Sequence, residues 1–150
     1  MKKLFIAALF ALAIGGSAFA AGTDLSDAAK LSYFVKNSFE KHFRDAQDVS
    51  WTVRESFAKA SFSMLGQKVE AFFGNDGELI GTSRKVQFER LPVLAVSKIR
   101  KEYEGYAVGE TIELTKYDDT NYYVSLSKGE KKQILEVTPS GHVSVFHPAR

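Results

Sequence analysis

The sequence contains no cysteine among its 150 residues. This absence excludes disulfide bonds, thiolate catalysis, cysteine-bound metal and lipid attachment through an N-terminal cysteine. Proline is also scarce, with three residues, and tryptophan occurs once. A chain without disulfides must be held together by its core. A globular chain of about 130 residues buries well over half of its unfolded surface, which suffices for one core.

Neither sign of charge is in large excess. The chain has 20 basic and 18 acidic residues, and without Lys2 and Lys3 the two counts are equal. Nucleic-acid-binding proteins usually concentrate a basic excess on one face. The composition therefore gives no support for a nucleic-acid partner.

Long apolar runs are missing except at the N-terminus. Lys2 and Lys3 precede an uncharged run over 4–14, and small residues follow up to Ala20. The run is shorter than the roughly 18 to 20 apolar residues that a membrane span needs. The pattern is typical of a secretory signal peptide over 1–20. We therefore expect an exported mature chain, 21–150, in the periplasm or secreted, with no membrane contact after cleavage.

The rest of the chain repeats one pattern of apolar spacing. Apolar residues recur every fourth position from Leu31 to Phe43, which predicts an amphipathic helix with Ser26 or Asp27 as its N-cap. Four segments with apolar residues at every second position follow, up to 86. The same succession restarts at Pro92, with a helix and four more alternating segments.

The turns repeat as well. Asn75-Asp76-Gly77 separates two alternating segments, and Pro139-Ser140-Gly141 does so again, with its glycine 64 residues later. The sequence therefore predicts an α+β fold in the order αββββαββββ, a single domain of two tandem repeats at about 27–88 and 91–147. Both helices should cover one face of one antiparallel sheet.

Several segments carry a family resemblance. "SFEKHFRDAQDVSW", "FAKASFSMLGQKVEAFFGNDGELIG" and "LPVLAVSKIRKEYEGY" resemble the secreted PepSY-like proteins described as β-lactamase-inhibitor-like, over residues 33–147. The resemblance implies two helix-plus-sheet repeats that form a curved sheet with the helices on its convex side. In the inhibitor that gives the family its name, the concave face grips an enzyme. That inhibitor has disulfides, which this chain cannot form.

No catalytic or metal-binding pattern stands out. His142 and His147 are five residues apart on a predicted strand, so they lie on opposite faces, and His42 lies on a helix flank. Asp118 and Asp119 sit where a turn is expected. Metal ligands must converge on one point, and no such set is predicted. We expect no cofactor, no metal and no enzymatic activity.

Five large apolar residues break the alternation. They are expected to project from the sheet face that no helix covers: Phe72, Ile80, Tyr123, Ile134 and Phe146. Arg84 and His142 are expected among the polar residues of that face, whereas Trp51 is expected in the core. Aromatic residues in polar surroundings are typical of protein interfaces. The other interpretation is cross-strand packing that only stiffens the sheet.

The sequence thus favours a non-enzymatic exported binding protein that uses the open face of its sheet. Its partner would be another exported protein, and an inhibitor of an extracytoplasmic enzyme is one form that such a protein takes. The alternative is a carrier of a small apolar ligand or a glycan, held in the hollow of the sheet. An enzyme of unrecognised type is a third hypothesis. The sequence specifies neither the partner nor the oligomeric state.

Overall fold

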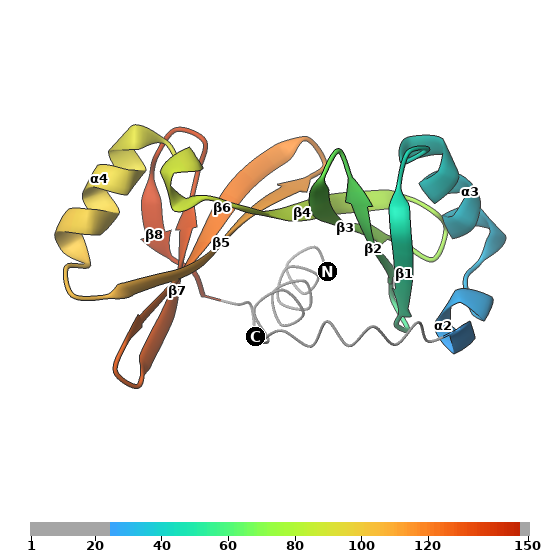
Figure 1. The fold of residues 1–150 in the computed structure, drawn as a ribbon, viewed down its shortest axis with the longest axis horizontal. Helices are drawn as coiled ribbons and strands as arrows, with labels where there is room; N and C mark the ends of the chain where they lie inside the picture. The colour runs from blue at the N-terminus through green and yellow to red at the C-terminus, as the bar shows by residue number, and fades with distance from the viewer. Residues whose placement is uncertain (1–24, 148–150) are drawn as a thin grey trace. The chain divides into compact units, whose positions relative to one another are not determined.

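The predicted α+β fold is confirmed in a computed structural model, which describes residues 25–147. The signal peptide predicted over 1–20 lies outside the described residues. The eight strands form one antiparallel sheet in chain order (Figure 1). The elements are α2 (Leu25–Ala29), α3 (Tyr33–His42), β1 (Gln47–Val53), β2 (Ala58–Met64), β3 (Gln67–Phe73), β4 (Leu79–Val86), η1 (Phe88–Arg90), α4 (Val93–Glu102), β5 (Ala107–Lys116), β6 (Asp119–Lys128), β7 (Lys131–Val137) and β8 (Val143–Val145).

The first predicted helix is divided in two. Ser32 has an extended backbone and is the N-cap of α3, because its side chain accepts a hydrogen bond from the Val35 amide at 3.2 Å. A serine at this position satisfies one of the unpaired amides of the first helical turn. The prediction of Ser26 or Asp27 as the cap of the long helix is therefore wrong. α2 is a separate turn of helix that contacts β1.

The chain forms two compact units, each described here by itself. The N-terminal unit comprises the described part of Ala21–Lys85 together with Glu113–Thr120. The C-terminal unit comprises Val86–Ile112 and the described part of Asn121–Arg150. The units follow the predicted repeats 27–88 and 91–147 except in one hairpin, since the tip between β5 and β6 belongs to the N-terminal unit.

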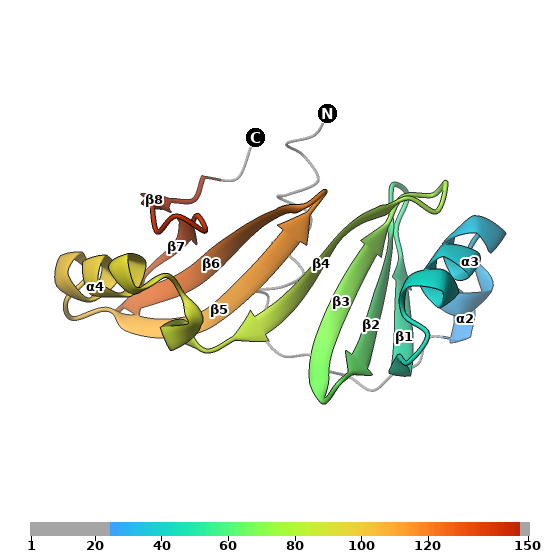
Figure 2. The same cartoon turned by 90° about the horizontal axis from the view of Figure 1, so that it is seen from above.

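The core of the N-terminal unit lies between α3 and the sheet. Leu31, Val35 and Phe39 form the apolar stripe of the helix segment, and all three are buried. The strands supply alternating residues, of which several are alanines, so the large rings have room: Ala58, Ala60, Phe62, Ala71 and Phe73. Trp51 packs at this core, with its ring 5.1 Å from that of Phe39. Its predicted place in the core is confirmed (α3 and β1 are seen side by side in Figure 2).

The core of the C-terminal unit has the same construction. Leu91, Ala95 and Ile99 form the buried stripe of the α4 segment. They pack against five strand residues: Val124, Leu126, Leu135, Val137 and Val143. The helix begins at Pro92, which is its N-cap, and Gly105 with a φ of +81° follows its end. Both boundaries agree with the sequence pattern.

The two repeated turns have the same task in their units. Gly77 and Gly141 adopt nearly identical positive φ values of 88° and 87°, which glycine accepts without steric cost. A Cβ on Gly77 would lie 2.6 Å from the carbonyl oxygen of Phe34, at the start of α3. A Cβ on Gly141 would lie 3.5 Å from Pro92, at the start of α4. In each unit, this hairpin therefore approaches the first turn of the helix.

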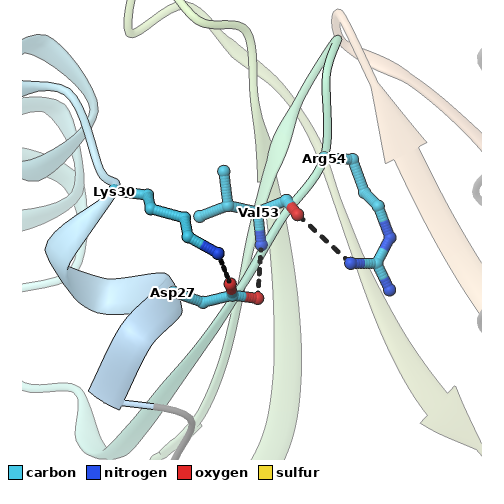
Figure 3. Close-up of polar contacts among 4 residues, drawn as sticks. All are labelled: Asp27, Lys30, Val53 and Arg54. Atoms are coloured by element: carbon cyan, nitrogen blue, oxygen red, sulfur yellow. Dashed lines mark hydrogen bonds and ion pairs between the residues drawn. The ribbon is translucent and has the colours of Figure 1, made fainter.

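A carboxylate covers part of the edge strand β1. Asp27 accepts hydrogen bonds from the Val53 amide and the Lys30 ammonium, both at 3.2 Å (Figure 3). The amide of Val53 and then Lys30 hold the pKa of Asp27 below its ordinary value. Asp48, with a φ of +53°, lies in an irregular stretch of pairing at the start of the strand. Occupied amides and irregular register both discourage pairing with a further strand.

Candidate binding surface

Each unit has a sheet face that points away from its helix-side core, and we call this the outer face of the unit. Alternation along the strands defines its members. The outer face of the N-terminal unit carries Lys59, Ser61, Glu70, Phe72 and Ser83. The outer face of the C-terminal unit carries Tyr123, Ser125, Ile134, Glu136, Ser144 and Phe146.

The outer face of the N-terminal unit contains a closed polar network. Lys59 is 8% exposed, and its ammonium lies 2.7 Å from the Glu70 carboxylate. Ser83 donates to the other oxygen of the same carboxylate at 3.3 Å. A buried cation is tolerated because it is paired and hydrogen-bonded. The carboxylate of Glu70 is thus neutralised within the chain.

Phe72 occupies the expected face but is not exposed there. It belongs to the face opposite α3, since it is directly paired with Lys59 and lies outside the helix-side core. However, only 1% of Phe72 is exposed, and the ring of Phe57 lies 6.2 Å away. The expectation of an exposed side chain is wrong at this position. Alternation gives the direction of a side chain, but it does not show how far neighbours on the same face cover it.

A β-bulge alters the arrangement of β4. Phe72 pairs with Gly81 and Phe73 pairs with Leu79, so Ile80 is the extra residue. Ile80 is 5% exposed, which contradicts the expected exposure. An inserted residue reverses the alternation beyond it. The bulge therefore determines the faces of all later residues of this strand.

Arg84 consequently lies on the helix side rather than on the outer face. It is paired with Val69, which packs against the core beneath α3. Its guanidinium donates to the Glu113 carboxylate at 2.7 Å and to the Gln67 side chain at 3.1 Å. The prediction that Arg84 belongs to the open face is wrong, because the bulge at Ile80 shifts the register by one residue.

On the outer face of the C-terminal unit, Tyr123 supports a carboxylate. Its hydroxyl donates to Glu136 at 3.0 Å, and its ring meets that of Phe146 edge-on at 5.3 Å. Burial, and then the negative charge of Glu136, raise the pKa of the Tyr123 phenol. Tyr123 is only 3% exposed, so its expected exposure is also wrong. Its contacts make it a support for the two neighbouring side chains.

The remaining predicted residues lie at the surface. Ile134 and Phe146 are half-buried on the outer face of the C-terminal unit, and the Phe146 amide donates to the Ile134 carbonyl at 2.8 Å. His142 is exposed in the turn before β8, where its amide donates to the Thr138 hydroxyl at 3.1 Å. The structure thus brings Tyr123, Ile134 and Phe146 together, and it leaves His142 at the margin.

The two outer faces use the same register for different residues. Lys59 faces Phe72 in the N-terminal unit, and 64 residues later Tyr123 faces Glu136 in the C-terminal unit. A cation opposite an aromatic ring is thus replaced by an aromatic ring opposite an anion. As a result, Glu70 has an internal counter-ion, whereas within residues 25–147 no cation lies within 4.0 Å of Glu136.

Among the described residues, the structure shows no group of three or more His, Cys, Asp or Glu side chains that could hold a metal. His42 donates from its ring to the Ser38 carbonyl at 2.8 Å within its own helix. The expectation of no enzymatic activity stays a prediction. Within the described part of the chain, none of the helices is long and apolar enough to cross a membrane.

Sequence patterns missed an apolar pair at the start of each long helix. Tyr33 and Phe34 on α3 are 75% and 63% exposed, and Val93 and Leu94 on α4 are 83% and 74% exposed. Val93 also lines an open hollow of about 580 Å³ along α4 with Val96, Ser97, Arg100, Lys101 and Glu104. These pairs follow the two N-caps and lie off the buried stripes, and that position was the available signal.

Comparisons with known proteins support the fold. No family model and no curated protein matches the chain. A solved DUF2874 family protein from Bacteroides uniformis is 19% identical, with a TM-score of 0.68 over 75% of this chain and 85% of that one. A protein from Bacteroides eggerthii, named as a candidate periplasmic protein, is 17% identical, with a TM-score of 0.68 over 75% and 84%.

A third solved structure carries the name that bears on the predicted resemblance. It is a BLIP-like protein from Bacteroides fragilis, 18% identical, with a TM-score of 0.67 over 79% of this chain and 84% of that one. The β-lactamase-inhibitor-like part of the resemblance is thus supported at the level of fold, while membership of the PepSY-like proteins stays a prediction. The chain has a BLIP-like fold that it shares with proteins of Bacteroides.

Proposed function

We propose that this chain is a non-enzymatic exported protein that binds another exported protein through the outer face of its C-terminal unit. The observation that carries the proposal is the placement of Ile134 and Phe146. Both are half-buried, both stand on or beside paired strands, and both lie next to a carboxylate held by Tyr123. Partly exposed apolar groups around a fixed polar group are typical of binding sites between proteins.

The rigidity of this surface favours binding. The Phe146 ring is held edge-on by the buried Tyr123 ring at 5.3 Å. Glu136 is fixed by a hydrogen bond and by the antiparallel pairing of β7 with β6 and β8. Side chains that are already ordered lose little conformational entropy when a partner binds. An extended face of this kind suits a protein partner, whose binding occludes the surface that it touches.

Export is part of the proposal and rests on two observations. The N-terminal sequence is typical of a signal peptide. In addition, one protein of similar fold is named as a candidate periplasmic protein. The partner is therefore sought among exported proteins.

The proposal is tested by affinity capture from a periplasmic extract, with the chain immobilised. Ile134→Ala combined with Phe146→Ala should abolish capture of the partner. Val93→Ala combined with Leu94→Ala is the matched control, because it removes two exposed apolar side chains from α4 of the same unit. Capture that survives the sheet variant and is lost with the helix variant would place the binding surface on α4 and contradict the proposal.

A further inference from the structure

Glu136 has an unsatisfied side. One of its carboxylate oxygens accepts the Tyr123 hydroxyl at 3.0 Å, and within residues 25–147 the structure gives this carboxylate no other hydrogen bond and no ion pair. The side chain is half-buried, between the buried Tyr123 and the exposed Ser144 of β8. A carboxylate that is partly removed from water and lacks a counter-ion is costly for the protein.

The N-terminal unit shows how the same chain meets this cost elsewhere. Glu70 is neutralised by Lys59 at 2.7 Å and receives a second hydrogen bond from Ser83. The position that corresponds to Lys59, 64 residues later, is Tyr123, which donates a hydrogen bond but carries no positive charge. The C-terminal unit thus keeps the polar support and omits the cation.

We propose that the outer face of the C-terminal unit binds a lysine or arginine side chain of the partner protein, with its cation on Glu136. The inference rests on the proposed function and names the chemistry of the partner. Charge complementarity selects a cation, and an arginine or ammonium group bound to a carboxylate makes stronger hydrogen bonds than a neutral group. Phe146 and Ile134, on the same face, provide apolar surface for the aliphatic stem of such a side chain and an aromatic ring for its charge.

Other occupants fit the site less well. A metal ion needs several oxygen or nitrogen ligands around one point, and here one carboxylate stands among apolar side chains. An anion would be repelled by Glu136. A purely apolar ligand would cover the carboxylate and remove it further from water.

The test uses a probe that needs no knowledge of the partner. The isotopically labelled chain is titrated with Nα-acetyl-arginine methylamide, and amide chemical shifts are followed by NMR. Shifts should concentrate at Ile134, Glu136 and Phe146. The matched control probe is Nα-acetyl-citrulline methylamide, which has nearly the same shape and no charge. We expect it to bind at least about tenfold more weakly.

Two variants locate the site independently. Glu136→Gln should remove binding of the arginine probe, while Glu70→Gln should leave it unchanged. Ser144→Lys keeps Glu136 but places a cation directly opposite it on β8, as an internal occupant. This exposed substitution should also abolish probe binding, and it keeps the test valid if Glu136→Gln fails to fold.

Equal shifts with the two probes, or probe binding that survives Ser144→Lys, would overturn the inference. Its failure is distinguishable from failure of the proposed function. If the partner is still captured by Ser144→Lys but is lost with the Ile134 and Phe146 double variant, the surface is correct and the basic side chain is wrong. If the double variant still captures the partner, the proposed function itself fails.

Discussion

The Tyr123 hydroxyl donates a hydrogen bond to Glu136 at 3.0 Å, at the register where Lys59 faces Phe72 in the first repeat. Replacing Tyr123 by phenylalanine removes this bond and keeps the ring. Hydrogen bonds to charged groups contribute roughly 1.5–3 kcal/mol, and the half-exposed Glu136 can regain water, so a loss of about 1 kcal/mol is expected. Chemical denaturation measures the loss, with Tyr117→Phe as an exposed control. An unchanged stability would show that the bond contributes nothing.

Tyr123 also predicts an alkaline loss of stability. Its pKa is raised in the folded protein above the ordinary value of 10. The unfolded chain therefore releases this proton more readily, and unfolding becomes easier as the pH rises above about 10. Tyr123→Phe should weaken this dependence between pH 9 and pH 11, relative to the same change in the wild type. Identical alkaline profiles for the two proteins would contradict the assignment.

Asp27 predicts an effect of opposite sign at acid pH. Its pKa is lowered below 3.8 by the Val53 amide and Lys30. Its contribution is therefore present above the pKa of the unfolded chain and is lost as the pH falls through the folded pKa. Asp27→Asn lacks the charge, so the free energy of unfolding of this variant should change less between pH 6 and pH 2. Equal acid dependence would show that Asp27 is not linked to folding.

The two hairpin glycines allow a matched comparison. Gly77→Ala and Gly141→Ala both force an alanine into a positive φ of nearly equal size, which costs about 1 kcal/mol or more in each case. Only the Cβ at position 77 would collide with backbone, 2.6 Å from the Phe34 oxygen. Gly77→Ala should therefore destabilise more, by at least about 1 kcal/mol. Equal thermal stabilities would mean that the hairpin does not press against α3.

Trp51 supports the N-terminal core from a partly buried position. Its ring contacts those of Phe39 and Phe73 at 5.1 and 6.0 Å. Trp51→Ala should cost about 3 kcal/mol, at the low end for a tryptophan deletion, because the ring is not fully enclosed. Circular dichroism in denaturant measures this, since the variant has no tryptophan fluorescence. A loss below about 0.5 kcal/mol, as for a typical surface substitution, would place the ring outside the core.

Spacing predicted the fold well because the signal is strong. Fourfold spacing from Leu31 to Phe43 and twofold spacing in the strands follow directly from one buried face per element. The helix boundary at Ser32 was missed, since the apolar stripe continues through it while the backbone does not.

The candidate site was predicted less well, for two physical reasons. The bulge at Ile80 inserts one residue, and this moves Arg84 to the helix side. Alternation also predicts direction rather than depth, so Phe72 and Tyr123 point to the expected faces but are covered there. The role of Glu136 required the register of β6 and β7, which the sequence does not specify.

The central claim is that the outer face of the C-terminal unit is the surface that meets a partner. Site-specific photocrosslinking in the exporting cell tests it most directly, with the photoreactive residue placed at the exposed Ser144 of β8 or at the exposed Ser97 of α4. We predict a discrete adduct with an exported protein from position 144 and none from position 97. An adduct formed only from position 97 would contradict the account.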